Sequence, residues 1–384
     1  MDTIMRKRIL KILLSVPVCF LCAVICLGSL ILLTAKRASP EPTIPPSDVQ
    51  ITDTYDRFIE AEMTASRDHL LTIPKKFWLS EDTVVAPRPN PASYGTSDTA
   101  AELGWLLEAA ASILDGQDTL FSTETVIMPG SKITYYLDDT IFAVTWKQVM
   151  SNFVYTISEV KIADPSQFRR YLADNEYNSG KLYPTTTMAQ TVNAVVGSSA
   201  DYYRGREFGI IVYDGKVMRV NNPGRADVCY IDKNADLLFS YHGQLMDAES
   251  AQKFVDENEI SFSIAFGPIL IDNGKRCDPA SYPIGEINDK YARGALCQRD
   301  KLHYLVVAAN SEQRYYNNQT IHEFTDNLML LGCQKAYTLD GGNTAAIAMD
   351  GKLINRTAFG YQRNLSDIIY FATAIPEQKQ INQE

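Results

Sequence analysis

Residues 320–355 read TIHEFTDNLMLLGCQKAYTLDGGNTAAIAMDGKLIN and predict a helix, a strand, a glycine turn and a hairpin in succession. Thr320 and Glu323 have the spacing of a capping box, and Gly332 follows the last apolar residue of the helical repeat, where glycine commonly ends a helix. The run KAYTL then predicts a strand that ends at Asp340. The C-terminal end of a strand that follows a helix is a common place for ligand-binding groups.

The segment Asp340-Gly341-Gly342-Asn343-Thr344 has two interpretations. It is either a tight turn between two strands, in which the acid only caps the turn, or a site where backbone and carboxylate approach a ligand. Two glycines favour close approach because they carry no Cβ, and the asparagine and threonine supply hydrogen-bonding groups. This segment alone leaves both interpretations open.

The rest of the chain reads as strands with a few helices. Asp-Gly or Asn-Gly pairs between apolar runs predict hairpins at 209–220, 267–277 and 345–355. Further strands are expected within 131–149, 153–162 and 301–310, and helices within 47–71, 100–116 and 164–174, the last capped by Asp164. Together these elements predict an α+β fold of mixed, largely antiparallel sheets with hairpins and flanking helices.

The N-terminus is expected to be a membrane anchor. Residues 12–35 contain no charged side chain, and a helix needs roughly 20 apolar residues to cross a bilayer. Four basic residues precede this run and two follow it, so the N-terminus should stay in the cytoplasm and the body outside, as a single-pass membrane protein. A cleaved signal peptide is the alternative, but its apolar core is usually only about 7–15 residues long.

The chain is expected to divide into five parts. Residues 1–37 form the basic stub and anchor, 38–48 a proline-rich linker, 49–148 a helical and strand subdomain, 149–375 the strand-rich domain, and 376–384 a polar tail. The linker holds four prolines in eleven positions, which is typical of a semi-rigid spacer.

Composition excludes some classes of function. With 46% hydrophobic and 21% charged residues, the chain is globular. Its net charge is -10 although residues 1–37 are basic, so the body is strongly acidic, which argues against nucleic-acid binding. Four histidines are scattered singly and give no metal motif.

Four cysteines of the body have two interpretations. They could form two disulfides outside the cell, with three connectivities, or remain small buried thiols. They are Cys229, Cys277, Cys297 and Cys333.

Three further positions could bind a phosphorylated sugar. Arg293 and Arg363 could hold a phosphate through paired hydrogen bonds, although a surface salt bridge is the simpler interpretation of each. Asp201 lies in a turn of small residues beside Tyr202. An acid next to a tyrosine suits sugar recognition, although an ordinary turn is the simpler interpretation.

The order of these segments resembles the phosphodiester glycosidase family over about residues 150–375. The resemblance is carried by ADYYRGREFGIIVYDGKVMR, FGPILIDNGK, ARGALC, residues 320–355 and QRNLSDII. It implies that residues 149–375 form a phosphodiester glycosidase-like domain. Many bacterial members of the family are associated with exopolysaccharide biosynthesis.

Several residues of the family motifs fall on positions of this chain. The family's acid in an Asn-Gly-Asp-aromatic turn falls on Asp201, with Ser199-Ala200 in place of Asn-Gly. Its Pro-Arg-Thr arginine falls on Arg293, its Asp-Gly-Gly on residues 340–342, and the arginine of its late Glu-Arg pair on Arg363.

Two family motifs are altered. The family's Asp-Gly-Arg after a strand is Ala309-Asn310-Ser311 here, and its Gly-Ser-Ser-Thr after the glycines is Asn343-Thr344-Ala345-Ala346. The first change removes an acid and an arginine. The second reduces the number of side-chain hydroxyl groups.

The resemblance implies a membrane-anchored extracellular enzyme that hydrolyses a sugar-1-phosphate diester in a cell-surface or exopolysaccharide glycan. The alternative is a member that binds a cell-wall phosphoglycan without cleaving it. Catalytic groups would be Asp340, Asp201 and Arg293, and substrate-binding groups Arg363, Gly341, Gly342, Asn343, Thr344, Ser199 and Tyr202. The sequence requires no cofactor. Ca²⁺ between Asp201 and Asp340 is conceivable, but no ligand spacing indicates it. The expected partners are a phosphorylated glycan and the cell membrane.

Overall fold

The computed structural model describes residues 77–78, 84–206, 208–221, 226–245, 247–279, 282, 289–310 and 319–376. All of them lie in one compact unit, residues 61–384. The expected anchor, the linker, the helix predicted at 47–71 and the tail beyond residue 376 lie outside the described residues. Within the described part of the chain, no helix is long and apolar enough to span a bilayer.

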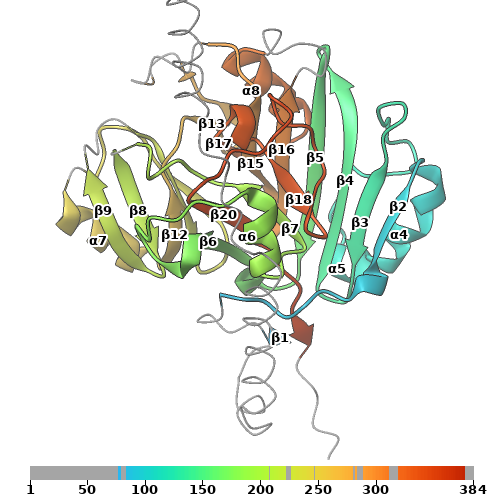
Figure 1. Cartoon of the computed structure of the whole chain (residues 1–384), viewed down its shortest axis with the longest axis horizontal. Helices are drawn as coiled ribbons and strands as arrows, with labels where there is room; N and C mark the ends of the chain where they lie inside the picture. The colour runs from blue at the N-terminus through green and yellow to red at the C-terminus, as the bar shows by residue number, and fades with distance from the viewer. Residues whose placement is uncertain are drawn as a thin grey trace, which may run out of the picture. The chain divides into compact units, whose positions relative to one another are not determined.

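A nine-stranded antiparallel sheet forms the centre of the unit (Figure 1). Its strands, in spatial order, are β14 (Lys275–Arg276), β13 (Ile269–Asp272), β17 (Lys335–Leu339), β15 (Arg293–Asp300), β16 (His303–Asn310), β5 (Phe153–Ile162), β4 (Ile141–Met150), β3 (Ile133–Leu137) and β2 (Tyr94–Ser97).

The other described strands form two five-stranded sheets and a two-stranded ribbon. One sheet is β11 (Leu237–Ser240), β10 (Val228–Asp232), β12 (Ile260–Ile264), β8 (Gly209–Tyr213) and β9 (Lys216–Asn221). The other is β19 (Lys352–Leu353), β18 (Ile347–Met349), β7 (Val196–Ser199), β20 (Asp367–Phe371) and β6 (Phe168–Leu172). The ribbon pairs β1 (Phe77–Trp78) with β21 (Ile375–Pro376).

Among the described residues, the helices are few and short. They are α4 (Gly104–Ala109), α5 (Ala111–Leu114), α6 (Thr185–Thr191), α7 (Ala248–Glu257) and α8 (Ile321–Leu330). Short 3₁₀ turns are η1 (Pro91–Ser93), η2 (Ala101–Leu103), η3 (Pro165–Gln167), η4 (Ala173–Asn175) and η8 (Gly342–Thr344).

The central sheet is buried on both faces, as β16 makes clear. All eight of its residues are buried. Leu305 and Val307 pack in a cluster with Phe324 of α8, whereas Tyr304 and Val306 pack on the opposite face with side chains of the two smaller sheets. A strand covered on both sides needs a nearly continuous apolar run, which is the character of its sequence.

The expected α+β fold with largely antiparallel sheets is confirmed for the described residues. Thr320 and Glu323 cap α8 reciprocally, and Gly332 follows it with a φ of 71°. The predicted hairpins are β8–β9, β13–β14 and β18–β19, and both residues of each Asp-Gly or Asn-Gly pair have positive φ.

Two helix predictions differ from the structure. Asp164 caps a turn as expected, but the turn is the three-residue η3, and residues 168–172 form strand β6 paired with β20. Phe168 and Leu172 are buried, so long-range pairing and burial override the local helical pattern. The helix expected over 100–116 is divided into η2, α4 and α5 and ends at Asp115, which has a φ of 47°.

The expected boundary at residue 148 falls inside a strand. β4 continues to Met150 and pairs along its length with β5, so one sheet runs across that boundary.

The four body cysteines are free thiols, and Cys229, Cys297 and Cys333 are buried.

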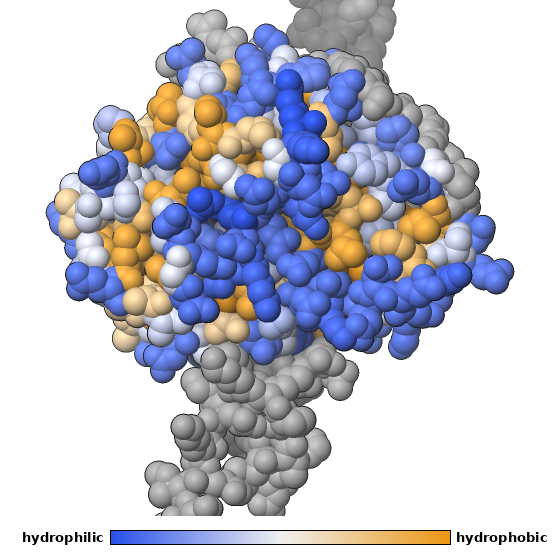
Figure 2. All heavy atoms as spheres, turned by 180° about the vertical axis from the view of Figure 1, so that it is seen from behind, coloured by the Kyte–Doolittle hydropathy of each residue, from blue (hydrophilic) through white to orange (hydrophobic). Residues whose placement is uncertain are grey.

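On the face shown in Figure 2, a band of hydrophilic residues runs between groups of hydrophobic ones.

Candidate active site

A cavity of about 570 Å³ opens where β17 ends and β15 begins. Its charged lining residues are Arg206, Arg293, Asp340 and Arg363. Its aromatic lining residues are Tyr202, Phe266, Tyr282, Tyr291, Phe359 and Tyr361. Gly341, Gly342 and Asn343 also line it, so the glycine turn faces the cavity, as the ligand-site interpretation requires.

Backbone hydrogen bonds hold the glycine turn against the start of β15. The amide of Gly342 donates to the carbonyl oxygen of Ala292 at 2.8 Å, and the amide of Asp340 donates to that of Ala200 at 3.1 Å. A Cβ at Gly341 would lie 2.5 Å from the Ala292 oxygen, so any side chain there would push the turn away. The glycine therefore brings Asp340 next to Arg293.

Asp340 forms an ion pair with Arg363 inside this cavity. The Nη2 atom of Arg363 donates to Oδ2 of Asp340 at 2.6 Å, and the guanidinium carbon lies 4.5 Å from the centroid of the Tyr202 ring. Only 9% of the Asp340 side chain is exposed, against 43% of that of Arg363. Burial raises the pKa of Asp340 above its usual value, although the charge of Arg363 opposes the shift.

The other two arginines of the cavity are held by aromatic rings and carbonyls. Arg293 is buried, its Nη2 atom donates to the carbonyl oxygen of Asp289, and its guanidinium carbon lies 5.6 Å from the Tyr291 ring centroid. Burial lowers the pKa of Arg293 to about 10, so it stays protonated at neutral pH. Arg206 lies over Phe266, 4.3 Å from that centroid.

Asp201 does not line the cavity. It is fully buried, and its Oδ2 atom accepts from Nη2 of Arg170 at 3.1 Å and from the amide of Ala265 at 2.9 Å. Arg170 also bonds Asp367 at 2.6 Å. The sequence placed Asp201 on the substrate; the structure places it in a buried group of two carboxylates and one arginine.

Two more predicted site residues lie outside the cavity lining. Ser199 is buried at the end of β7, opposite Ile368 of β20. Thr344 is buried, and its hydroxyl donates to the carbonyl oxygen of Gly341 at 2.5 Å, which shapes the turn. The structure thus brings together Asp340, Gly341, Gly342, Asn343, Arg293, Arg363 and Tyr202, and leaves out Asp201, Ser199 and Thr344.

Sequence reasoning missed Arg206 and most of the aromatic lining. Phe359 and Tyr361 are 52% and 62% exposed, and their ring centroids lie 6.3 Å apart at the cavity. The amide of Phe359 donates to Oδ1 of Asn343 at 2.8 Å, which ties their loop to the glycine turn. Aromatic residues beside glycines, as in Phe266-Gly267 and in Phe-Gly-Tyr-Gln-Arg at 359–363, were the available signal.

Asn310, at the altered Asp-Gly-Arg motif, has a structural contact. It is buried, and its Nδ2 atom donates to the carbonyl oxygen of Arg356 at 2.7 Å, near the start of the loop that carries Phe359. Among the residues that the structure describes, no group of three or more His, Cys, Asp or Glu side chains could hold a metal ion.

The match to one family model covers the residues that line the cavity. Residues 189–372 match the family model described as phosphodiester glycosidase. An uncharacterized SPbeta prophage-derived protein of Bacillus subtilis (strain 168), YomE, is 23% identical over 188 residues, which are 48% of this chain and 28% of that protein. This chain therefore covers well under a third of that relative.

Two solved structures are similar at 14% identity. The zebrafish N-acetylglucosamine-1-phosphodiester alpha-N-acetylglucosaminidase catalytic domain, auto-inhibited by its pro-peptide, has a TM-score of 0.48, with 80% of this chain and 99% of that chain covered. A hypothetical protein from Synechocystis has a TM-score of 0.44, with 65% and 64% covered. By the family match, residues 189–372 of this chain form a phosphodiester glycosidase family domain.

Proposed function

We propose that this protein hydrolyses a glycosyl phosphodiester, cleaving the bond between the anomeric carbon and the phosphate oxygen. The observation that carries the proposal is the charge of the candidate cavity. Three arginines and one carboxylate are the charged groups among its described lining residues, in a chain with a net charge of -10. Such a cavity attracts a phosphate, which arginine can bind through two parallel hydrogen bonds.

The site residues have separate roles in this reaction. Arg293 and Arg363 hold the phosphate, and the exposed rings of Phe359 and Tyr361 stack on the sugar. Water adds to the anomeric carbon as its bond to the phosphate oxygen breaks, and one proton of the water passes to Asp340. The products are a free sugar and a phosphomonoester.

The charge pattern suits this chemistry. The leaving phosphomonoester is an anion that the arginines stabilise, so the reaction needs no strong general acid. A carboxylate whose pKa burial has raised accepts a proton more readily than an exposed aspartate does.

The cellular setting is part of the proposal. The uncharged run at 12–35 and the basic residues before it support a membrane-anchored body outside the cell, acting on a cell-surface or exopolysaccharide glycan. Protease added to intact cells should digest the body, while a tag at residue 1 stays with the membrane. A mature protein released into the medium would contradict the anchor.

A second candidate is a protein that binds such a glycan without cleaving it. The observation in its favour is Ala309-Asn310-Ser311, which replaces the family's Asp-Gly-Arg and so lacks its acid and its arginine. Both candidates are tested by incubating the detergent-solubilised full chain with methyl phosphodiesters of several sugar-1-phosphates. Release of free sugar and methyl phosphate supports hydrolysis. Saturable binding without release supports the second candidate. If no sugar is released and no substrate is bound, both candidates are overturned.

A further inference from the structure

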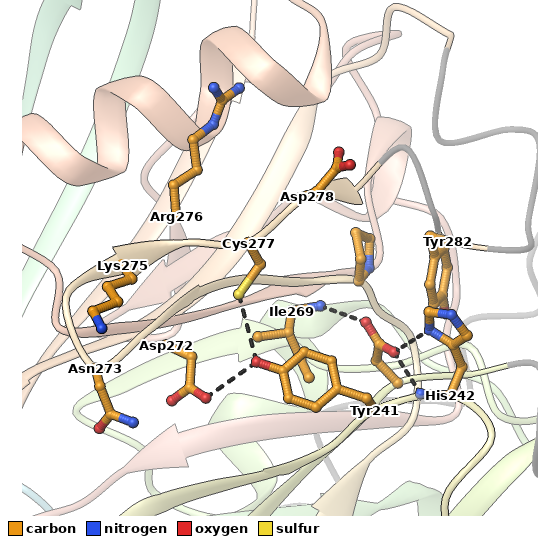
Figure 3. Close-up of a pocket in the computed structure, with 12 residues that line it drawn as sticks. Tyr241, His242, Ile269, Asp272, Asn273, Lys275, Arg276, Cys277, Asp278 and Tyr282 are labelled. Atoms are coloured by element: carbon orange, nitrogen blue, oxygen red, sulfur yellow. Dashed lines mark hydrogen bonds and ion pairs between the residues drawn. The ribbon is translucent and has the colours of Figure 1, made fainter.

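A second cavity of about 450 Å³ adjoins the first (Figure 3). Tyr282 lines both cavities, and the neighbouring residues Gly267 and Pro268 line the first and the second respectively. The two cavities therefore meet at one tyrosine and one short backbone segment. The proposed reaction assigns no role to this second space.

A histidine in the second cavity is fixed by a buried carboxylate. Oδ1 of Asp227 lies 2.8 Å from Nδ1 of His242 and also accepts from the backbone amide of that residue. Oδ2 accepts from the amide of Ile269 at 3.0 Å. The carboxylate thus fixes the ring orientation, and no described residue bonds Nε2. The His242 side chain is 29% exposed, so Nε2 is available to a ligand.

The opposite side of the cavity offers an aromatic ring and a second carboxylate. Figure 3 shows the Tyr241 ring along the cavity floor, with its hydroxyl turned toward Asp272 and Cys277. That hydroxyl donates to Oδ2 of Asp272 at 3.1 Å and lies 3.7 Å from Sγ of Cys277. Burial raises the pKa of the Cys277 thiol, so a thiolate nucleophile is not favoured there.

The charges of the second cavity favour a phosphate less than those of the first do. Three aspartates line the cavity. Of its two basic residues, Arg276 turns toward α8, where its Nε atom lies 3.3 Å from Asp326 and its Nη2 atom 2.9 Å from Nδ1 of His322. The lining of the second cavity therefore has more acidic than basic side chains, in contrast to the first with its three arginines and one aspartate. An aromatic floor with convergent imidazole and carboxylate groups suits an uncharged ring with hydroxyl groups.

We propose that the second cavity is a subsite for an uncharged sugar ring, the unit attached to the far side of the phosphate that the first cavity binds. The inference rests on the proposed function, because that function supplies the phosphate between the two sugars. His242 and Asp272 hydrogen-bond the hydroxyl groups of this ring, and Tyr241 packs against its face.

The kinetic test compares two substrates of the full chain. One is a sugar-1-phosphodiester with a methyl group on the far side, and the other carries a hexose there. His242→Ala should raise KM for the hexose substrate by about tenfold or more, while kcat and the methyl substrate stay unchanged. Asp272→Asn should act in the same direction. Lys253→Ala, at an exposed position of α7 outside both cavity linings, is the control and should change neither substrate.

Other kinetic outcomes overturn the inference. An equal loss with both substrates would make His242 a residue that only maintains the fold or the first cavity. Unchanged kinetics with both substrates would show that no sugar is bound there.

A binding measurement separates this inference from the proposed function. Saturation-transfer NMR of the full chain with methyl glycosides of glucose, galactose, mannose and N-acetylglucosamine should give a signal that His242→Ala removes and Asp340→Asn keeps. If the protein hydrolyses nothing but this signal is present, the subsite stands and the proposed function fails. If none of the four glycosides gives a signal sensitive to His242→Ala, the subsite is overturned.

Discussion

Asp340 owes its position to one neighbouring residue without a side chain. Gly341 lets the turn touch the Ala292 carbonyl oxygen, and this contact brings the carboxylate beside the arginines of the cavity. The carboxylate is nearly buried, and burial raises its pKa. The ionised form of Asp340 therefore lowers the free energy of unfolding.

We therefore expect Asp340→Asn to separate activity from stability. Hydrolysis of a substrate cleaved by the wild-type protein should fall by about 10²-fold or more, as for other positioned acid–base groups. The melting temperature should change little or rise, because asparagine removes a buried charge and the partly exposed Arg363 can be hydrated. Parallel activity and melting measurements check this. Retained activity with a large fall in melting temperature would make Asp340 a structural residue.

The raised pKa of Asp340 also predicts a pH dependence. A base must be deprotonated, so kcat/KM should fall as the pH drops through a value above the usual aspartate pKa of about 3.9. Arg363→Met removes the charge that opposes the shift and should move this limb to higher pH. An acid limb at or below the usual aspartate pKa would contradict the assignment.

The raised pKa of Asp340 also determines how stability changes with pH. The folded state binds the Asp340 proton more tightly than the unfolded state does. The contribution of this group to the free energy of unfolding therefore decreases as the pH rises from about 3.9 through the folded pKa.

At the scale of elements, one buried arginine joins three of them near the cavity. Arg170 of β6 bonds Asp367 of β20, Asp201 just after β7, and the carbonyl oxygen of Ser263 in β12. Burial raises the pKa of Asp367, whereas the two carboxylates raise that of Arg170 against the effect of its own burial. Arg170 thus places one positive charge between two buried carboxylates.

Arg170→Leu should consequently destabilise the fold more than most substitutions. It leaves two buried carboxylates without their cation, and breaking such a pair costs about 3–5 kcal/mol in the free energy of unfolding. Urea titration measures the loss. Adding Asp201→Asn and Asp367→Asn to the same protein should recover part of it. If Arg170→Leu alone unfolds at the wild-type urea concentration, the three charges do not act as a unit.

Elements whose signals are local could be predicted from the sequence. The capping box of α8 and the Asp-Gly and Asn-Gly hairpins depend on residues within a few positions of each other. Strand β6 could not, because its state is decided by pairing with β20, about two hundred residues away. The group formed by Asp201 was missed for the same reason, since its partner Arg170 lies on that strand.

At the scale of the whole molecule, the candidate site is assembled from distant segments. Tyr202, Phe266, Asp340 and Arg363 come from four different loops, and Arg293 is the first residue of β15. The glycine turn and the order of the segments predicted several of them. The aromatic residues and Arg206 could not be placed, because only the packing of the sheets decides which loops meet.

Cleavage in water enriched in the heavy oxygen isotope tests the central claim most directly. A glycosidase adds water to carbon, so mass spectrometry of the products of the full chain should find the isotope in the released sugar and none in the phosphomonoester. Arg293→Met should reduce both products together, since its guanidinium lines the same cavity. Isotope in the phosphomonoester would contradict the account, because it would mean that the protein breaks the phosphorus–oxygen bond and is not a glycosidase.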